Sequence, residues 1–203
     1  MRKIILASNN QHKIGEIRSI LKDLEFEIRS LKDEGINIDV VEDGKSFKEN
    51  SQKKATEIAA YLRERGDNNF IVMADDSGLE VDYLNGEPGI YSARYAGEHG
   101  DDKANNIKLL ENLQGVPYSK RTGRFVCVIA LVDSDNNIIS IRGEAKGIIK
   151  EELCGSEGFG YDPLFYYEPL RKTFSEMSSD EKNKVSHRGM ALKKLRAELE
   201  NYR

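Results

Sequence analysis

The segment Phe70–Leu79 reads FIVMADDSGL, and it constrains the fold more than any other stretch of the chain. Its apolar run, residues 70–74, predicts a buried β-strand. Two carboxylates, Asp75 and Asp76, follow at once, and we expect the strand to end at them. Like charges beside a buried strand are unfavourable unless a cation lies near them. Because α/β proteins usually bind ligands at the carboxyl ends of strands, the acid pair predicts a functional site.

Hydrophobic periodicity before this strand predicts a strand, a loop and two helices. Residues 4–7 form the predicted strand, and the loop SNNQHK, residues 8–13, leads into the first helix. Ser46, with Glu49 three residues later, is a capping-box signature for a second helix that ends near Gly66. The first helix is expected to bury one apolar face, made of Ile14, Ile17, Leu21 and Leu24.

After the acid pair the pattern alternates between strands and helices. Residues 79–83 predict a half-buried strand that ends at an Asn-Gly turn, and 124–132 predict a long strand with 138–147 as its hairpin partner. A helix is expected from Asp101, with Ala104, Ile107, Leu110 and Leu113 facing inward. The last helix is expected to bury Ala191, Leu192, Leu195 and Leu199. This order predicts an α/β fold with a mixed sheet in a single domain, residues 1–203.

Composition excludes several classes of partner. The net charge of −4 and the pI of about 5.6 disfavour binding to long nucleic acid, although a small anionic ligand needs only a few local cations. We expect no membrane span, because the chain has no run of eighteen apolar residues. The opening MRKIILASNN is too short in its apolar run for a signal peptide. Two cysteines form neither a disulfide framework nor a metal-ligand spacing, so a cytoplasmic protein is expected.

Two loops in the first half of the chain carry groups suited to phosphate and metal. The loop 8–13 places backbone N–H groups, Ser8, Asn10 and Lys13 at a helix N-terminus, which favours anions. The alternative is an ordinary N-cap by Asn10 with a solvated lysine. The acid pair suits Mg²⁺, or a general base for an attacking water. The alternative there is a polar turn with both acids in solvent.

Two loops in the second half carry groups suited to a base. In the loop 155–163, GSEGFGYDP, three glycines permit close approach of the backbone to a ligand, and the Phe159 ring is placed to stack on a base. Asp162 is placed to accept hydrogen bonds from a purine edge. The alternative is a flexible hairpin loop with Phe159 in the core. Lys182 is a candidate phosphate ligand, and the segment 186–189 offers donors to a carbonyl; the alternative is a charged helix entrance.

Six separated motifs resemble one family along nearly the whole chain. They are ASNNQHKIGE, SFKENSQKKA, ADDSGLEVD, PGIYSARYAG, GFGYDPLF and EKNKVSHRG. In this order they resemble the inosine triphosphate pyrophosphatases, also called XTP/dITP diphosphatases. The first motif departs from the family, which has Thr-Gly-Asn where this chain has Ser-Asn-Asn at 8–10. That change removes a glycine from the turn and leaves the polar donors in place.

The resemblance implies a fold, an activity and a set of site residues. It implies an elongated mixed sheet with flanking helices, two lobes around a central nucleotide cleft, and a cytoplasmic homodimer. It also implies Mg²⁺-dependent cleavage of ITP, dITP and XTP to the monophosphate and pyrophosphate. Asp76 matches the proton acceptor and metal ligand, with Asp75 and Glu42 as further candidate ligands; Val41 occupies one alternative position for the latter carboxylate. Substrate contacts are implied for Ser8, Asn9, Asn10, Gln11, His12, Lys13, Ser77, Phe159, Gly160, Tyr161, Asp162, Lys182, His187 and Arg188.

Two other functions compete with this hypothesis. A haloacid-dehalogenase-type phosphatase needs Asp-x-Asp at its strand end, but this chain has Ser77 where the second aspartate is required. A nucleotide-sensing module would bind without turnover. The acid pair disfavours that role, because a binder of polyanions gains nothing from extra acids without a metal.

Overall fold

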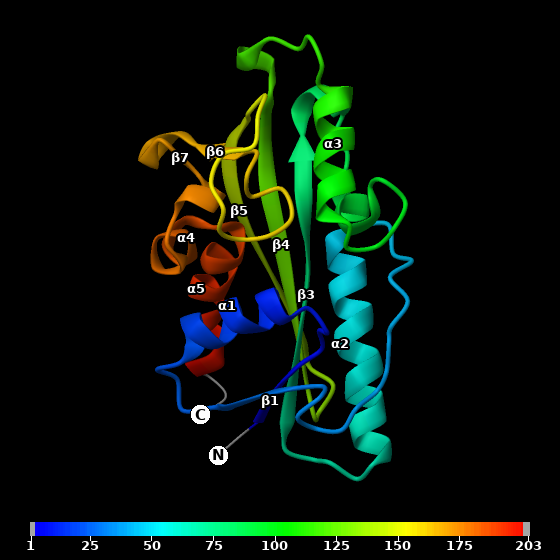
Figure 1. Cartoon of the computed structure of the whole chain (residues 1–203). Helices are drawn as coiled ribbons and strands as arrows, with labels where there is room; N and C mark the ends of the chain where they lie inside the picture. Colours follow the sequence, from blue (N-terminus) through cyan, green and yellow to red (C-terminus); the bar gives the residue numbers. More distant parts are fainter. Residues whose placement is uncertain (1–2, 201–203) are drawn as a thin grey trace. The chain divides into compact units, whose positions relative to one another are not determined.

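The computed structural model describes residues 3–200, and the chain in it divides into two compact units (Figure 1). The first unit contains the chain up to Asp76, residues 127–143 and the chain from Ala191 onward. The second contains residues 77–126 and 144–190. Three strands and the last helix continue from one unit into the other, so neither unit is one continuous stretch of sequence.

The first unit contains three parallel strands and has helices on both faces of its sheet. β1 pairs in parallel with β2 and with β3, and the register places Ile4 beside Ile28 and Ile71. Asn10 caps α1, and Ser46 caps α2 by accepting a hydrogen bond from the Glu49 backbone N–H, as the sequence predicts. The elements of this unit are β1 (Lys3–Leu6), α1 (Gln11–Leu21), β2 (Glu27–Ser30), α2 (Phe47–Glu64) and the start of β3 (Phe70–Val81).

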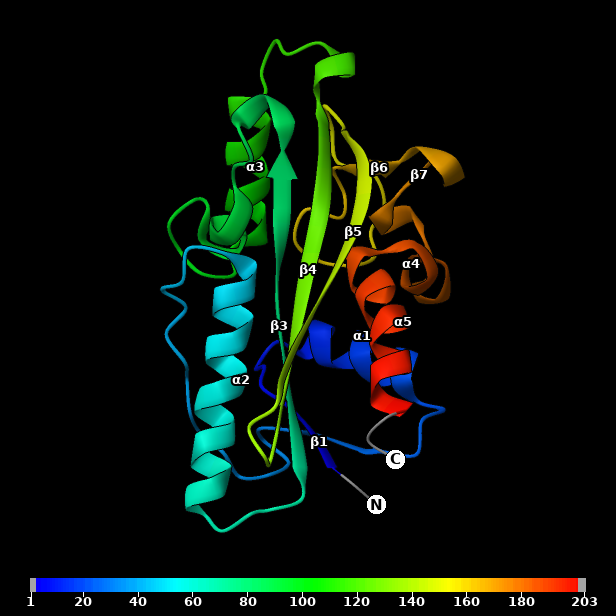
Figure 2. The same ribbon diagram turned by 180° about the vertical axis from the view of Figure 1, so that it is seen from behind.

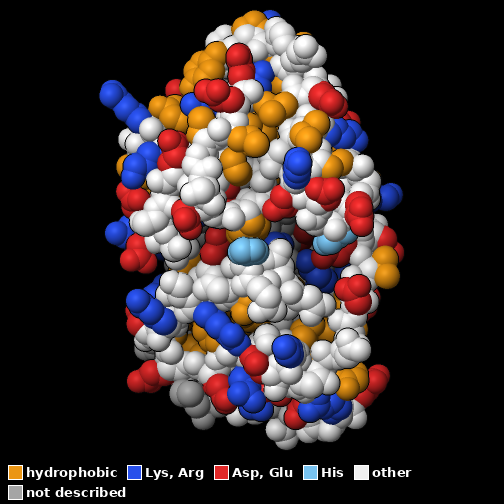
Figure 3. All heavy atoms as spheres, in the orientation of Figure 1, with side chains coloured by type: hydrophobic (Ala, Val, Ile, Leu, Met, Phe, Trp, Pro, Cys, Tyr) orange, Lys and Arg blue, Asp and Glu red, His pale blue; other side chains and the backbone are white. Residues whose placement is uncertain are grey.

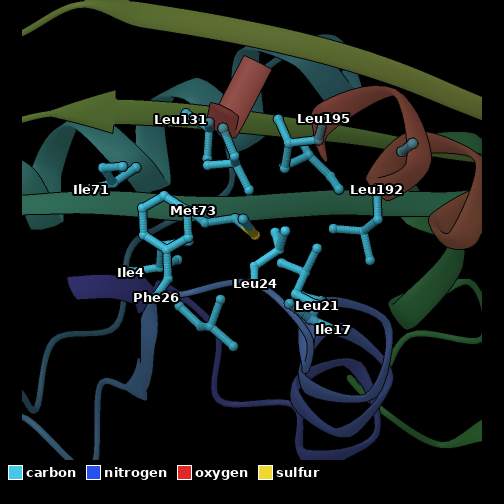
Figure 4. Close-up of a cluster of buried hydrophobic side chains, with 14 of the residues drawn as sticks. Ile4, Ile17, Leu21, Leu24, Phe26, Ile71, Met73, Leu131, Leu192 and Leu195 are labelled. Carbon is cyan, nitrogen blue, oxygen red and sulfur yellow. The ribbon is translucent and has the colours of Figure 1, made fainter. Parts of the chain in front are cut away.

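Alternation along β3 sends successive side chains to opposite faces of this sheet. Phe70, Val72 and Ala74 join a core cluster with α2. Ile71 and Met73 join a second cluster with α1 and α5, in which side chains of β1, α1, β3, β4 and α5 point toward one another (Figure 4). The predicted inward faces of α1 and α5 are confirmed, since Ile17, Leu21 and the four expected residues of α5 are buried there.

The second unit builds its own core beside long antiparallel strands. β5 pairs antiparallel with β6, and β6 with β7. The aromatic rings of Phe125, Phe165 and Phe174 lie together at the centre of this unit's core. The whole sheet is mixed and seven-stranded in the order β2-β1-β3-β4-β5-β6-β7 (Figure 2). The remaining elements are α3 (Asp102–Asn112), β4 (Thr122–Asp133), β5 (Ile138–Ile149), β6 (Phe165–Tyr167), β7 (Lys172–Thr173), α4 (Ser179–Val185) and α5 (His187–Glu200).

The structure corrects the prediction that a strand ends at the acid pair. β3 runs from Phe70 to Val81 without a break, so Asp75 and Asp76 lie within it and the predicted strand 79–83 is its continuation. The two charges are tolerated inside the strand because each meets a cation or an amide, as described below. The short elements β2, β7 and α4 were not predicted.

The inward face of α3 also differs from the prediction. Ile107 is 47% exposed, whereas Asn105 and Asn106 are buried on the inner side with Leu109 and Leu113. Leu113 is buried as predicted and Leu110 packs against the core, so the prediction is wrong for Ile107. Apolar spacing gives no weight to asparagines that bond to loop backbone groups and are buried for that reason.

Charged side chains of both signs lie at the surface. Figure 3 shows Lys, Arg, Asp and Glu side chains interspersed over the face in the orientation of Figure 1. Within residues 3–200, none of the helices is both long enough and apolar enough to cross a bilayer.

Candidate active site

The loop before α1 is an ordered turn at a helix N-terminus. The Asn10 side-chain oxygen accepts a hydrogen bond from the Lys13 backbone N–H at 3.1 Å, and Ser8 Oγ accepts one from the Asn10 N–H at 3.2 Å. Asn9, Asn10, Gln11 and His12 are exposed at the same helix start, whereas Ser8 and Lys13 are half-buried. The turn therefore keeps its predicted N-cap and presents polar side chains to solvent.

Lys13 is not the solvated lysine of the alternative hypothesis. Its Nζ lies 3.2 Å from Asp75 Oδ2, and the Asp75 side chain is fully buried. Asp75 points to the sheet face that carries α1, which is the face that Ile71 and Met73 also occupy. This ion pair ties the N-terminal turn of α1 to β3.

Asp76 points to the other sheet face, toward α2. Asn50 donates a hydrogen bond from Nδ2 to Asp76 Oδ2 at 2.9 Å, and its Oδ1 accepts one from the Gly44 N–H at 2.8 Å. Gly44 is required there, because a Cβ would lie 2.6 Å from Asn50 Oδ1. The alternative of a polar turn with both acids in solvent is wrong, since Asp75 and Asp76 are 2% and 5% exposed.

Lys54 of α2 places a buried ammonium group beside the acids. Its Nζ donates to Glu42 Oε1 at 2.5 Å and to the Asp75 carbonyl at 2.7 Å. Burial raises the pKa of Asp76 above its ordinary value, although the charges of Lys54 and Lys13 act in the opposite direction. A buried carboxyl with a raised pKa is a candidate general base, because its affinity for a proton is increased.

The donor set of this unit fits Mg²⁺ in the form that the ion takes with phosphate substrates. Mg²⁺ is usually held by one or two carboxylates, with waters and substrate oxygens filling its other positions. Asp76 and Glu42 supply two such carboxylates around Lys54. Asp75 is directed to the opposite face of β3 and is paired with Lys13. In the described chain, residues 3–200, side chains of His, Cys, Asp and Glu form no cluster of three or more that could hold a metal alone.

In the second unit, the glycine-rich loop is folded around one aspartate. Asp162 Oδ2 accepts hydrogen bonds from the Phe159 N–H at 2.9 Å and from Lys182 Nζ at 2.6 Å. Gly158 has φ of +82°, and a Cβ there would collide with the Asp162 carboxylate. Asp162, which the sequence suggests as a reader of the purine edge, is thus buried and holds the loop in shape.

Lys182 is buried beneath the ring of Phe159. Its Nζ lies 4.7 Å from the ring centroid, a cation–π distance, while the Phe159 side chain is half-buried. The alternative hypothesis of a solvated charged helix entrance is wrong for Lys182, which is 5% exposed and ion-paired with Asp162.

The residues that open α5 are also buried. The imidazole ring of His187 stacks on Phe125 with centroids 4.7 Å apart and an interplanar angle of 14°. Arg188 donates from Nη2 to Ser77 Oγ at 3.0 Å. Because Ser77 directly follows Asp76 in β3, this bond joins the start of α5 to the residue after the acid pair.

The chemistry-bearing residues thus form two groups, one in each unit. The first unit brings together Lys13, Glu42, Asp75 and Asp76 with two residues that sequence reasoning missed, Asn50 and Lys54. Both lie in the motif SFKENSQKKA, where their spacing of four residues on one helical face was an available signal. In the second unit, Phe159 and Lys182 both bond to Asp162, and Arg188 bonds to Ser77.

Buried carboxylates beside lysines on a parallel sheet, with a helix N-terminus at the end of β1, are features of α/β proteins that bind phosphorylated ligands. Comparison with known proteins identifies the family within this class of α/β proteins. The model of the Ham1 family matches residues 4–198, and the chain belongs to this family.

Named relatives and solved structures agree with that assignment. A Clostridium perfringens protein named dITP/XTP pyrophosphatase is 60% identical over 199 residues, which cover 98% of each chain. A Clostridium tetani protein of the same name is 48% identical, covering 100% of this chain and 98% of the other. The structure of the Staphylococcus aureus Ham1 protein matches with a TM-score of 0.86 and 42% identity, covering all of both chains.

Proposed function

We propose that this protein hydrolyses deaminated purine nucleoside triphosphates, ITP, dITP and XTP, to the monophosphate and pyrophosphate, and so removes them from the nucleotide pool. The observation that carries the proposal is the environment of Asp76: a buried carboxyl with a raised pKa, bonded to Asn50 and close to Lys54 and Glu42. The names of its relatives support the same substrate class.

The residues of the first unit are suited to the triphosphate. The N-terminal turn of α1 offers Ser8, Asn10 and the positive end of the helix dipole, and Lys13 and Lys54 add two ammonium groups. Each lysine is already oriented by a carboxylate or a carbonyl, so less side-chain entropy is lost when phosphate binds. We propose that these groups bind the phosphates of the substrate.

Asp76 is proposed to act as the base toward water. Asn50 donates to one carboxylate oxygen of Asp76 and so orients the group, which we propose accepts a proton from a water that attacks the α-phosphorus in line. Mg²⁺, held by Asp76 and Glu42 together with substrate oxygens, would neutralise charge on the leaving pyrophosphate. Lys54 holds Glu42 in place and keeps positive charge near the same oxygens.

The residues of the second unit are proposed to bind the base. Phe159 offers a ring for stacking, and the N–H groups of His187 and Arg188 are suited to the C6 carbonyl of hypoxanthine or xanthine. Adenine carries an amino group at C6 and would leave those donors unsatisfied. A mismatch of this kind gives discrimination on the order of 10⁴-fold.

We further propose that the protein is a homodimer of the cytoplasm, as its resemblance to the pyrophosphatases implies. The competing phosphatase function is disfavoured because β3 continues as a regular strand through Ser77, where a second catalytic aspartate would be needed. The sensing module remains the alternative that a turnover assay decides.

The direct test is incubation with ITP, XTP, dITP and the four ordinary ribonucleoside triphosphates, with and without Mg²⁺. We expect pyrophosphate from the three deaminated purine nucleotides, a requirement for Mg²⁺, and little product from ATP. Release of orthophosphate would indicate a phosphatase instead. Binding of ITP without any product would indicate the sensing module.

A further inference from the structure

The buried polar face of α3 has no role in the function proposed so far. Asn105 and Asn106 lie on that face, which the sequence predicts to be formed by apolar residues, and Asn106 is 6% exposed. Buried amides are unfavourable unless their polar atoms are bonded. The partners of the Asn106 amide are therefore informative about why it lies there.

Asp102 and Asn106 hold the two polar groups of one residue in the glycine-rich loop. The Gly160 N–H donates to Asp102 Oδ2 at 2.7 Å, and the Gly160 carbonyl accepts from Asn106 Nδ2 at 2.8 Å. Asn106 Nδ2 also donates to the Asp102 carbonyl at 2.8 Å, which links the two clamping residues. Residue 160 is thus fixed on both sides by the first turn of α3.

Asp102 and Asn106, which we call the clamp, bond to the backbone of Gly160. The sequence of the loop therefore does not predict these bonds. Gly160 has φ of +63°, a conformation suited to glycine, and open space surrounds the position that a Cβ would take. Asn106 Oδ1 is buried and, within residues 3–200, has no hydrogen-bond partner. Leucine at position 106 would avoid that cost, but it would remove a donor from the Gly160 carbonyl.

The clamp is one of three anchors on consecutive loop residues. The Tyr161 hydroxyl donates to the Ser92 carbonyl at 2.8 Å, and Asp162 is held by Lys182. Phe159, immediately before the clamped residue, then has its N–H bonded to Asp162 and its ring over Lys182. The orientation of the Phe159 ring follows from the three anchors.

We infer that Asp102 and Asn106 are positioning residues for base recognition, which hold Gly160 so that Phe159 is already oriented for stacking on the purine. This inference rests on the proposed function and adds two residues to it. The hydrogen bonds that Asp102 and Asn106 make to Gly160 lie within the second unit, so we expect the clamp to affect binding of the base and not the chemical step. Loss of such uniform binding raises KM and leaves kcat unchanged.

The test compares Asp102→Ala, Asn106→Ala and Asp102→Asn with a matched control, Asp101→Ala. Asp101 caps α3 by accepting from the Ala104 N–H at 2.9 Å, but it does not bond to Gly160. The control therefore weakens the same helix end without removing the clamp. Steady-state hydrolysis of ITP gives kcat and KM, and amide hydrogen exchange reports on the Gly160 N–H.

We expect Asp102→Ala and Asn106→Ala to raise KM for ITP by about tenfold, with kcat within about twofold of wild type. Exchange of the Gly160 amide should be faster in Asp102→Ala. Asp102→Asn should recover most of the wild-type KM, because the amide oxygen still accepts from Gly160. Asp101→Ala should lower the unfolding temperature and keep the wild-type KM.

Two results would overturn the inference in distinguishable ways. A wild-type protein that does not act on ITP would remove the proposed function and this inference with it. An active wild type, with an unchanged KM in Asp102→Ala or an equal rise in Asp101→Ala, would overturn the positioning role alone.

Discussion

The two adjacent acids of β3, Asp75 and Asp76, point to opposite faces of the sheet and have different partners there. Asp75 is directed to the face of α1, where Lys13 neutralises it, while Asp76 is directed to the face of α2, where Asn50 and Lys54 lie. The alternation of a β-strand separates the two carboxylates without any residue between them. One acid therefore orients a lysine, and the other is available for chemistry.

This division predicts the effect of removing one charge. We expect Asp76→Asn to lower kcat by about 10² to 10⁴-fold, because an amide cannot take the proton from water. Nucleotide binding, measured by calorimetry, should survive because the lysines of the site remain. Asp135→Asn, on the exposed β4–β5 turn, is the matched control and should keep the wild-type rate. Wild-type pyrophosphate release by Asp76→Asn would show that another group is the base.

Sequence reasoning found the charged residues of the site more readily than the residues that hold them. Asp76 and Lys13 were predicted from their places at a strand and at a helix start. Asn50 and Asn106 were not, because a buried asparagine acquires its role from a partner distant in sequence, Asp76 in one case and Gly160 in the other. Spacing along the chain can place two residues on one face of a helix, but it does not predict which distant residue either of them bonds to.

At the scale of elements, long periodic segments were predictable and short ones were not. α1, α2, the β4–β5 hairpin and α5 follow their apolar patterns. β7 has two residues and α4 has seven, too few for a periodic signal. The sequence predicts two strands in place of β3, because the central residues of β3 are charged. In the structure β3 is one continuous strand, and the acid pair within it is stabilised by hydrogen bonds and an ion pair.

The short helix α4, which supplies Lys182, is held at its start by a capping box. Ser178 and Glu181 exchange hydrogen bonds, and Glu181 also accepts from Lys172 Nζ at 2.9 Å. The Ser178 backbone N–H, Lys172 and the Ser178 hydroxyl together lower the pKa of Glu181 from its ordinary 4.5 to about 2. The cap therefore depends on an ionised Glu181.

A pH prediction follows from this depressed pKa. The folded state favours ionised Glu181, so the stability it contributes is present above pH 4.5 and is lost as the pH falls toward 2. We expect Glu181→Gln to unfold at lower urea concentration than wild type at pH 6, with a difference that shrinks as the pH falls toward 3. Glu98→Gln controls for the loss of one exposed negative charge. A difference that is constant with pH would contradict the role of the carboxylate.

At the scale of the whole molecule, one of the places where the chain passes from the first unit to the second lies at candidate site residues. The boundary in β3 lies between Asp76 and Ser77, so the proposed base and the residue bonded to Arg188 are consecutive. The order of predicted strands and helices correctly predicts the class, an α/β protein with a mixed sheet. It says nothing about the division into units, because that depends on long-range packing.

The central claim is that water, activated at Asp76, attacks the α-phosphorus of a deaminated purine triphosphate. Hydrolysis of ITP in water labelled with ¹⁸O, followed by mass spectrometry of both products, tests it directly. We expect one ¹⁸O atom in inosine monophosphate and none in pyrophosphate. Label in pyrophosphate would place the attack at the β-phosphorus, and labelled orthophosphate would mean that the terminal phosphate is the one removed; either result would contradict the account.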